Sequence, residues 1–353
     1  MIEWLPDTEL PGYEQFTIPL PEAPTYAFEQ PGSLVATVVR RNPPSGDRAV
    51  LYVHGWNDYF FQTHLADSLT ADGFDFHALE LRRYGRSLRE GHLAGYIAAM
   101  EDYFVELDLA MDLLREAGYR EIVLMGHSTG GLVAALYAHE RPGAFSALVL
   151  NSPWIELQGS PVIRPAAQPV FRAMSAVAPT TVLVAYETSN YARSICVELE
   201  GEWAYNLALK GNQAFGVRIG WLRAVMAGHA RVEQGLAIDC PVLVLTSAHS
   251  DFSRKWHEGL MTADVVLNVD RIAARVHQLG RHVTLVRIEG AVHDIVLSAA
   301  PVREIFFDEV ERFLAAYSRV PEAAEEPRAE DLGAEESAAE DVSEGVGDES
   351  RSD

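Results

Sequence analysis

Two hydrophobic patterns alternate along the first 151 residues. Short apolar runs bounded by Gly, Pro, Asn or Asp are typical of strands, and longer segments with apolar residues at helical spacing separate them. Strands that alternate with helices predict a mostly parallel, doubly wound α/β sheet that helices cover on both faces. The predicted strands are 13–20, 34–41, 49–54, 75–81, 122–125, 147–151, 241–246 and 282–288, and the predicted helices are 64–72, 97–117, 132–139 and 302–317.

This rhythm stops at residue 152 and resumes after residue 235. Prolines interrupt the first half of the intervening segment, and its second half is rich in Trp, Tyr and Arg without strand alternation. We therefore interpret 1–151 and 236–320 as two parts of one core, and 152–235 as a helical lid inserted between them. The aromatic residues of this lid either line an acyl or alcohol pocket or form a small core of their own. They are Trp203, Tyr205, Phe215 and Trp221.

Acidic residues dominate the end of the chain. Residues 321–353 hold 13 Asp and Glu against 2 Arg, so this segment carries −11 of the formal net charge of −23 and the rest carries −12. It contains no aromatic residue and little apolar surface, and we predict a disordered acidic tail. An acidic body disfavours nucleic acids and anionic membrane surfaces as partners.

Cysteine usage and the apolar runs indicate the compartment. The chain has two cysteines, Cys196 and Cys240, which suits a reducing environment better than a disulfide framework. Its first residues lack the basic and then apolar pattern of a signal peptide, and no apolar run approaches the ~18 residues of a membrane span. We expect a cytoplasmic protein without integral membrane association, and the sequence leaves its oligomeric state open.

One stretch carries the strongest chemical signal. The apolar run 122–125 ends in Gly126-His127-Ser128-Thr129-Gly130-Gly131, and a helical pattern follows at once. This is G-x-S-x-G between a strand and a helix, where a sharp turn places the serine at its tip and small flanking residues avoid a collision. We predict that Ser128 is a nucleophile and that the N–H of Thr129, at the start of the helix, binds an oxyanion.

An activated serine needs a base and a carboxylate that orients the base. A base is expected in the loop after the last strand, where His293 follows the apolar run 282–288. The carboxylate is expected after the preceding strand, 241–246, and two residues qualify there, Asp251 and Asp264. The residue pattern alone leaves this choice open.

The chain resembles the α/β-hydrolase superfamily, and within it the monoacylglycerol lipase and lysophospholipase branch, also grouped as serine aminopeptidases. The resemblance covers about residues 49–317. It rests on His54-Gly55-Trp56-Asn57-Asp58, on residues 80–87, on the turn at Ser128 and on Gly290-Ala291-Val292-His293.

This resemblance implies an α/β-hydrolase fold and assigns further residues. In that branch the acid precedes two apolar residues and lies roughly thirty residues before the histidine, which favours Asp264 over Asp251 and makes 247–262 an unusual insertion. The branch also places the second oxyanion donor after the H-G pair, at the N–H of Trp56. Near residue 83 the family has D-x-R-G-x-G-x-S, and Glu80 and Arg83 depart from it, which leaves a substrate role for Arg82 or Arg83 in doubt.

The resemblance implies a serine hydrolase that cleaves a lipid-like or small carboxylic ester. It needs no cofactor, and we find neither a dinucleotide-binding motif nor the helical histidine spacing of zinc sites. One alternative is an aminopeptidase or amidase with the same triad, which requires an acidic anchor for a substrate amine. The lid offers four candidate anchors for this amine, Glu187, Glu198, Glu200 and Glu202. A second alternative is a non-catalytic interaction module with this fold.

Overall fold

The computed structural model describes residues 3–26, 28–41, 45–156, 174–184 and 189–318. Residues Met1–Arg319 form one compact unit. The predicted disordered tail, 321–353, lies outside the described residues, as does Glu187. None of the helices in the described ranges is long and apolar enough to cross a membrane.

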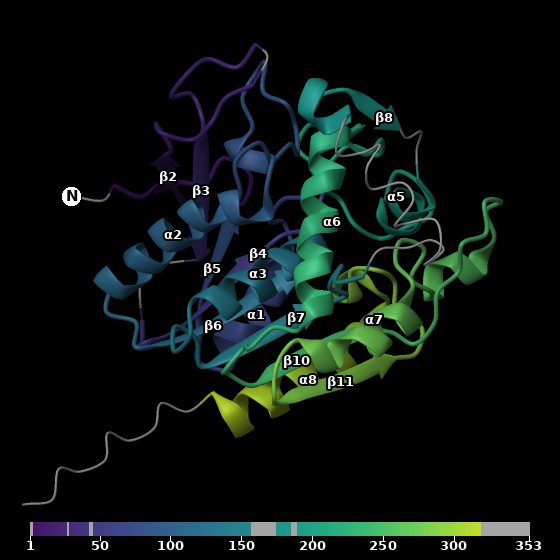
Figure 1. The fold of residues 1–353 in the computed structure, drawn as a ribbon. Helices are drawn as coiled ribbons and strands as arrows, with labels where there is room; N and C mark the ends of the chain where they lie inside the picture. Colours follow the sequence, from purple (N-terminus) through teal and green to yellow (C-terminus); the bar gives the residue numbers. More distant parts are fainter. Residues whose placement is uncertain (1–2, 27, 42–44, 157–173, 185–188, 319–353) are drawn as a thin grey trace, which may run out of the picture. The chain divides into compact units, whose positions relative to one another are not determined.

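A nine-stranded sheet forms the centre of this unit, in the order β1-β2-β3-β5-β4-β6-β7-β10-β11 (Figure 1). The first three strands pair antiparallel, β3 pairs antiparallel with β5, and every pairing from β5 to β11 is parallel. The strands are β1 (Leu5–Pro6), β2 (Tyr13–Pro19), β3 (Val35–Arg41), β4 (Arg48–Val53), β5 (Asp75–Glu80), β6 (Glu121–His127), β7 (Ala147–Asn151), β10 (Val242–Ser247) and β11 (Val283–Ile288). The predicted mostly parallel α/β sheet is confirmed.

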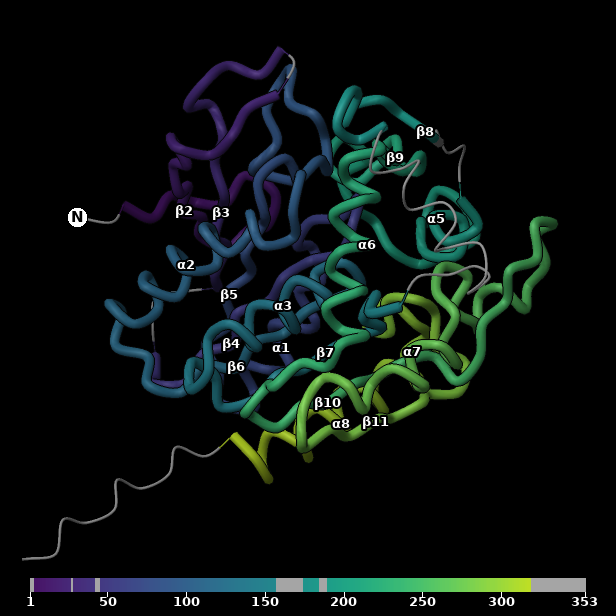
Figure 2. The backbone as a smooth tube through the Cα atoms, in the orientation of Figure 1, coloured from purple at the N-terminus to yellow at the C-terminus, as the bar shows by residue number. Residues whose placement is uncertain are grey.

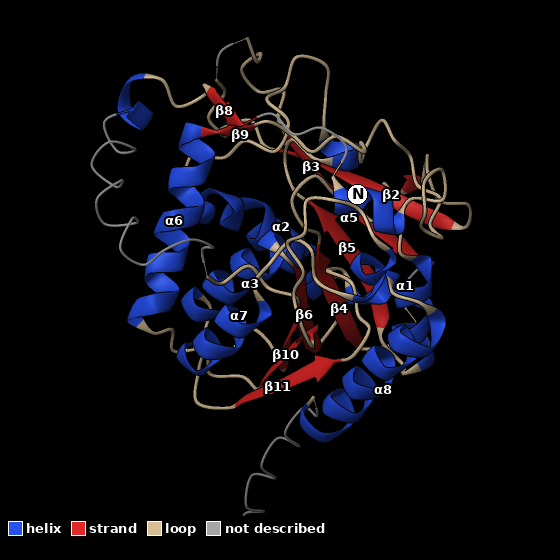
Figure 3. Cartoon of the chain, turned by 90° about the vertical axis from the view of Figure 1, so that its right-hand side faces the viewer, coloured by secondary structure: helices blue, strands red, loops and turns tan. Residues whose placement is uncertain are grey.

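Helices cover both faces of the sheet (Figure 3). Helices α1 (Thr63–Ala71) and α8 (Ala300–Tyr317) pack on one face, and α2 (Phe104–Glu116), α3 (Thr129–Glu140), α6 (Ile219–Gln234) and α7 (Val269–Arg275) pack on the other. Successive side chains of a strand point to opposite faces of the sheet, so neighbouring residues join different cores. In β6, Leu124 joins the core under α3 and Val123 joins the core under α8.

Helix α3 is surrounded by protein, since every residue from Thr129 to Ala138 is buried. This explains why its sequence is apolar all round, without the stripe of a surface helix. The predicted helix 97–117 is shorter than expected. The short 3₁₀ helix Met100–Tyr103 precedes α2, and the Asp102 carboxylate accepts the N–H of Ala99 at its start (3.2 Å).

The segment predicted as a helical lid differs in part from that prediction. It contains α5 (Asn190–Ile195), but also a two-stranded antiparallel sheet of β8 (Val182–Val184) and β9 (Val217–Arg218). Strands this short leave no alternating pattern in the sequence. Its last helix, α6, packs on α3, so Figure 2 shows it beside the core helices.

Candidate active site

The turn between β6 and α3 holds Ser128 in a conformation that L-amino acids rarely adopt, with φ of 52° and ψ of −116°. The neighbouring glycines make this turn possible. A Cβ on Gly126 would lie 2.6 Å from the carbonyl oxygen of Gly130, and a Cβ on Gly130 would lie 2.2 Å from that of His54. Strand, helix and the neighbouring strand end therefore approach so closely that no side chain fits between them.

Ser128 stands at one end of a hydrogen-bonded chain. Its Oγ lies 3.0 Å from Nε2 of His293, and Nδ1 of His293 lies 2.9 Å from Oδ2 of Asp264. An ionised carboxylate can only accept, so Nδ1 carries the proton and Nε2 is free to accept the serine hydroxyl proton. All three side chains are buried, and Ser128 keeps 7% of its accessible surface.

Backbone groups orient the Asp264 carboxylate. Its Oδ1 accepts the N–H groups of Val266 (2.8 Å) and Leu267 (2.7 Å), which leaves Oδ2 directed at His293. These bonds to backbone N–H groups two and three residues ahead hold the Asp264 side chain in one orientation.

Asp251 is adjacent in the backbone but faces elsewhere. Its N–H donates to the carbonyl of Asp264 (3.0 Å), while its carboxylate lies 3.3 Å from Nε2 of His257 on the exposed side. The structure thus brings Asp264, and not Asp251, to His293.

The residue after His293 anchors the histidine loop. The fully buried Asp294 accepts Nδ2 of Asn151 (2.7 Å) and Nε2 of Gln62 (3.1 Å). Together with the bond from the Val292 N–H to Ser298 Oγ (3.0 Å), these contacts fix the loop that presents the imidazole.

The loop after β4 comes close to Ser128. A Cβ on Gly55 would lie 3.2 Å from Cβ of Ser128, so a side chain here would crowd the serine. His54 holds the carbonyl of Gly55 through Nδ1 (2.7 Å), and its Nε2 accepts the N–H of Leu81 (3.1 Å). A trans peptide points its C=O and N–H in opposite directions, so the N–H of Trp56 points away from the His54 ring.

The other predicted donor, the N–H of Thr129, belongs to the first residue of α3. An N–H at this position has no carbonyl four residues back within the helix. The loop that carries Gly55 and Trp56 and the first residue of α3 therefore both adjoin Ser128.

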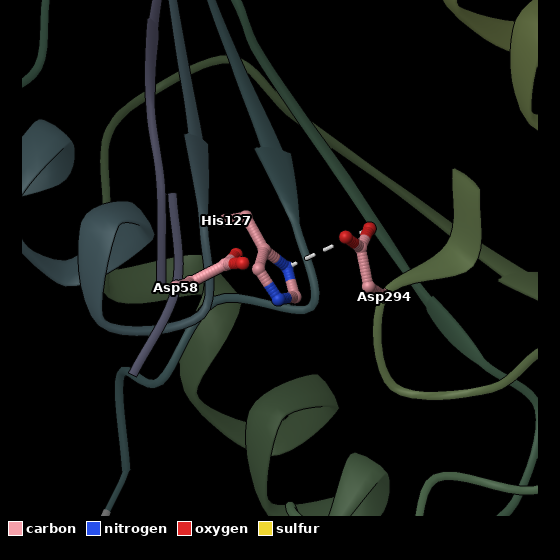
Figure 4. Close-up of side chains that lie close together, drawn as sticks. All are labelled: Asp58, His127 and Asp294. Carbon is pink, nitrogen blue, oxygen red and sulfur yellow. Dashed lines mark ion pairs between the residues drawn. The ribbon is translucent and has the colours of Figure 1, made fainter. Parts of the chain in front are cut away.

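A second polar cluster lies beside the serine, formed by Asp58, His127 and Asp294 (Figure 4). One ligand-type atom from each lies within 4.8 Å of the others, and the His127 ring stands between the two carboxylates in this view. Lys210 contributes a positive charge here, because its Nζ lies 2.6 Å from Oδ1 of Asp58.

Burial and neighbouring charges shift the pKa of His127 and of Asp58. Burial lowers the pKa of His127 and outweighs the attraction of Asp294, so this imidazole is neutral near pH 7. Burial alone would raise the pKa of Asp58, but the positive charge of Lys210 holds it below its ordinary value. Asp58 is therefore a buried carboxylate whose charge depends on Lys210.

Sequence reasoning assigned no role to Asp58 or Lys210. Asp58 was visible as the fifth residue of the H-G segment, and Lys210 as one of only two lysines in the chain. Their contact joins residues 152 positions apart, and no spacing rule predicts it.

Several other candidates lie away from the serine. Arg82 and Arg83 are buried in ion pairs with Glu106 and Glu29, with Nε to carboxylate distances of 2.7 and 2.6 Å, so neither faces a substrate. Arg83 has φ of 68°, which explains why the family has glycine at this position.

The candidate amine anchors do not form an acidic pocket in the described part of the lid. Glu198, Glu200 and Glu202 are exposed, and Glu200 pairs with Arg193.

Each of the four lid aromatic residues packs on a ring of the core. Phe215 and Trp221 pack on Trp56, with ring centroids 6.1 and 4.9 Å apart. Tyr205 packs on Phe61 (5.3 Å). Trp203 stacks on His64 and donates its indole N–H to the carbonyl of Leu297 (2.7 Å).

The residues between β10 and α7, which include the expected insertion, reach toward the lid (Figure 2). Nδ2 of Asn190 in α5 donates to the carbonyl of Ser253 (2.9 Å), and the Arg193 guanidinium lies 4.4 Å from the Trp256 ring centroid. This segment therefore contacts α5 through both of these residues.

The sheet order, the serine turn and the histidine loop after the last strand define an α/β hydrolase. Residues 44–298 match the family described as serine aminopeptidase, S33, and the chain belongs to this family. This agrees with the branch that the sequence motifs indicated.

Individual relatives are more distant. Over 122 residues the chain is 30% identical to epoxide hydrolase 3 of Xenopus tropicalis, a match that covers 34% of this chain and 30% of that protein. The match therefore spans less than a third of that relative's length.

Solved structures share the fold. The monoacylglycerol lipase of Paleococcus ferrophilus is 18% identical, with a TM-score of 0.54 over 76% of this chain and 93% of that one. A soluble variant of monoglyceride lipase from Saccharomyces cerevisiae is 15% identical, with a TM-score of 0.56 over 83% of this chain and 96% of that one. At these identities the likeness establishes the fold and leaves the substrate open.

Proposed function

We propose that the protein is a serine hydrolase that cleaves carboxylic esters through an acyl-enzyme. The observation that carries this proposal is the buried hydrogen-bonded chain Ser128–His293–Asp264, with distances of 3.0 and 2.9 Å. Serine, imidazole and carboxylate in this order form the arrangement that activates a hydroxyl for acyl transfer.

The first half of the reaction transfers the acyl group to the enzyme. His293 Nε2 takes the Ser128 proton as Oγ bonds to the ester carbonyl carbon, and Asp264 stabilises the imidazolium. The N–H groups of Thr129 and Trp56 bind the tetrahedral oxyanion. The intermediate collapses, the ester C–O bond breaks, and the alcohol leaves with the proton from His293.

Water completes the cycle. His293 takes a proton from water, whose oxygen attacks the acyl carbon, and a second tetrahedral intermediate releases the acid and restores the Ser128 hydroxyl.

We propose a small-molecule or lipid-like ester as the substrate, and a protein that acts in the cytoplasm. The serine aminopeptidase family and the lipase names of the two structural neighbours favour acyl compounds. Trp56 and Phe215, which packs on it, are half-buried and provide apolar surface next to the proposed oxyanion site. For an aminopeptidase the exposed lid glutamates offer little support, since a substrate amine beside Ser128 needs a carboxylate there.

The test compares p-nitrophenyl esters, from acetyl to lauroyl, with aminoacyl p-nitroanilides. We expect faster turnover of an ester, and a loss of about 10⁴- to 10⁶-fold in turnover for Ser128→Ala. The matched control is Ser146→Ala. Ser146 directly precedes β7, at the end of the strand away from Ser128, so this variant should keep wild-type turnover.

A fluorophosphonate probe separates the remaining readings. Labelling of the wild type that disappears in Ser128→Ala supports the proposal. Absent labelling would favour a non-catalytic module, and faster anilide turnover would favour an aminopeptidase or amidase.

A further inference from the structure

The loop that follows β4 lies between the core and the lid segment. At its first end, His54 holds the Gly55 carbonyl, as described above. At its other end, Asp58 pairs with Lys210, which comes from the lid and is 5% exposed. The Gly55–Trp56 peptide lies between these two attachments.

The residues on either side of Asp58 are also held by the lid segment. Nδ2 of Asn57 donates to the carbonyl of Gly211 (3.1 Å), and the hydroxyl of Tyr59 accepts the N–H of Asn206 (2.8 Å). Asn57 has φ of 54°, a left-handed conformation that asparagine adopts more readily than most residues other than glycine. Three successive loop residues are therefore tied to residues 206–211.

Lys210 is enclosed at this position. Its Nζ lies 5.1 Å from the ring centroid of Phe61 and 5.7 Å from those of Tyr191 and Tyr205. These aromatic rings and the buried Asp58 carboxylate hold the Lys210 ammonium in place. If the ammonium withdrew, Asp58 would be left buried and unpaired.

We propose that Lys210 is a positioning residue for the oxyanion hole. Through Asp58 it fixes the loop that directs the Trp56 N–H toward the developing oxyanion at Ser128. The lid segment 206–211 thereby controls turnover without touching the substrate. This inference rests on the proposed ester hydrolysis.

If the Asp58–Lys210 pair only stabilised the fold, its loss would have different consequences. Misplacement of an oxyanion donor lowers the rate of the chemical step while substrate binding is kept, because the donor acts on charge that develops in the transition state. Loss of an ion pair that acts only on stability lowers the melting temperature and leaves the turnover number of the folded enzyme unchanged.

The experiment uses the full-length enzyme and the variants Lys210→Met, Asp58→Asn and the double variant. Met keeps most of the lysine stem. The double variant removes both charges and leaves no unpaired ion at this pair, so we expect it to fold. The matched control is Lys255→Met, which alters the chain's other lysine at an exposed position.

Four quantities are measured for each variant: kcat and KM for the best p-nitrophenyl ester, the Kd of a boronic acid transition-state analogue, and the melting temperature. We expect the double variant to melt near the wild type but to lose about 10- to 100-fold in kcat. Its KM should change less than about threefold, and the analogue should bind more weakly in proportion to kcat/KM. Lys255→Met should match the wild type in all four.

The outcomes separate this inference from the proposed function. Wild-type kcat and analogue binding in a folded double variant would overturn the role of Lys210 and leave ester hydrolysis intact. Absence of wild-type turnover and of Ser128 labelling would instead overturn the function itself. Partial recovery of kcat in Lys210→Arg, which restores a cation, would support the inference further.

Discussion

The two N–H groups proposed for the oxyanion belong to loops that are held in different ways. Thr129 belongs to the serine turn, whose shape follows from its own glycines and from the adjacent end of β4. Trp56 belongs to the loop 54–59, whose later residues are tied to residues 206–211, some 150 positions away. One donor is therefore fixed by the core, and the other depends on the lid segment.

This difference separates two kinds of catalytic geometry. The serine turn joins β6 to α3, and the close backbone contacts of its glycines leave it little room to shift. The loop 54–59 can shift if the lid segment shifts, so a variant far from the serine can lower the rate. Four predictions test this contrast, from the largest expected effect to the smallest.

The largest expected effect is a difference in turnover between variants of Asp264 and Asp251, two aspartates that lie side by side in the backbone. Asp264→Asn should lower turnover by about 10⁴-fold, because Asn cannot hold the His293 tautomer or stabilise its cation. Asp251→Asn should change turnover by less than about threefold, because its partner His257 is exposed. Steady-state kinetics with an ester substrate measure both, and the reverse ranking would reject Asp264 as the acid.

The second prediction concerns the rigidity of the serine turn. Gly130→Ala should lower the free energy of unfolding by about 3 kcal/mol and turnover by more than about 100-fold, since the new Cβ would meet the backbone of Val53 and His54. Gly46→Ala is the control, because its Cβ would meet no atom closer than 4.0 Å. Urea denaturation and kinetics measure the effects. A stable, active Gly130→Ala enzyme would show that the core does not fix this donor.

The third prediction concerns Asn57 in the loop. Asn57→Ala should lower the free energy of unfolding by about 2 kcal/mol, from a lost hydrogen bond and from strain at positive φ. Asn57→Gly should cost about 1 kcal/mol, because glycine accepts this φ. Denaturation of both variants gives the two values. Equal losses would mean that backbone strain plays no part in this loop.

The smallest effect is a pH dependence at His54. Burial lowers the pKa of this imidazole, so below its ordinary pKa of about 6.5 the unfolded chain binds more protons than the native one. The free energy of unfolding should therefore fall as the pH drops beneath that value. His54→Gln should make this fall shallower in denaturation curves at about pH 7.5 and about pH 5.5. An unchanged slope would show that His54 does not link the loop to pH.

The sequence by itself determined the sheet, the serine turn and the family. Buried strands and the G-x-S-x-G turn depend on residues close in sequence, so Ser128 was assigned from its neighbours. His293 could also be assigned, because it directly follows the last strand. Asp264 could not be chosen from the residues alone, and only the spacing of the family it resembles favoured it.

Only the tertiary structure decided which carboxylate meets His293 and what holds the Trp56 loop. Asp251 and Asp264 lie side by side in the backbone, and the direction of each side chain depends on packing from several segments. The Asp58–Lys210 pair joins two loops that carry no shared pattern. Contacts between residues far apart in the chain leave no local periodicity, so their partners become visible only when the fold brings them together.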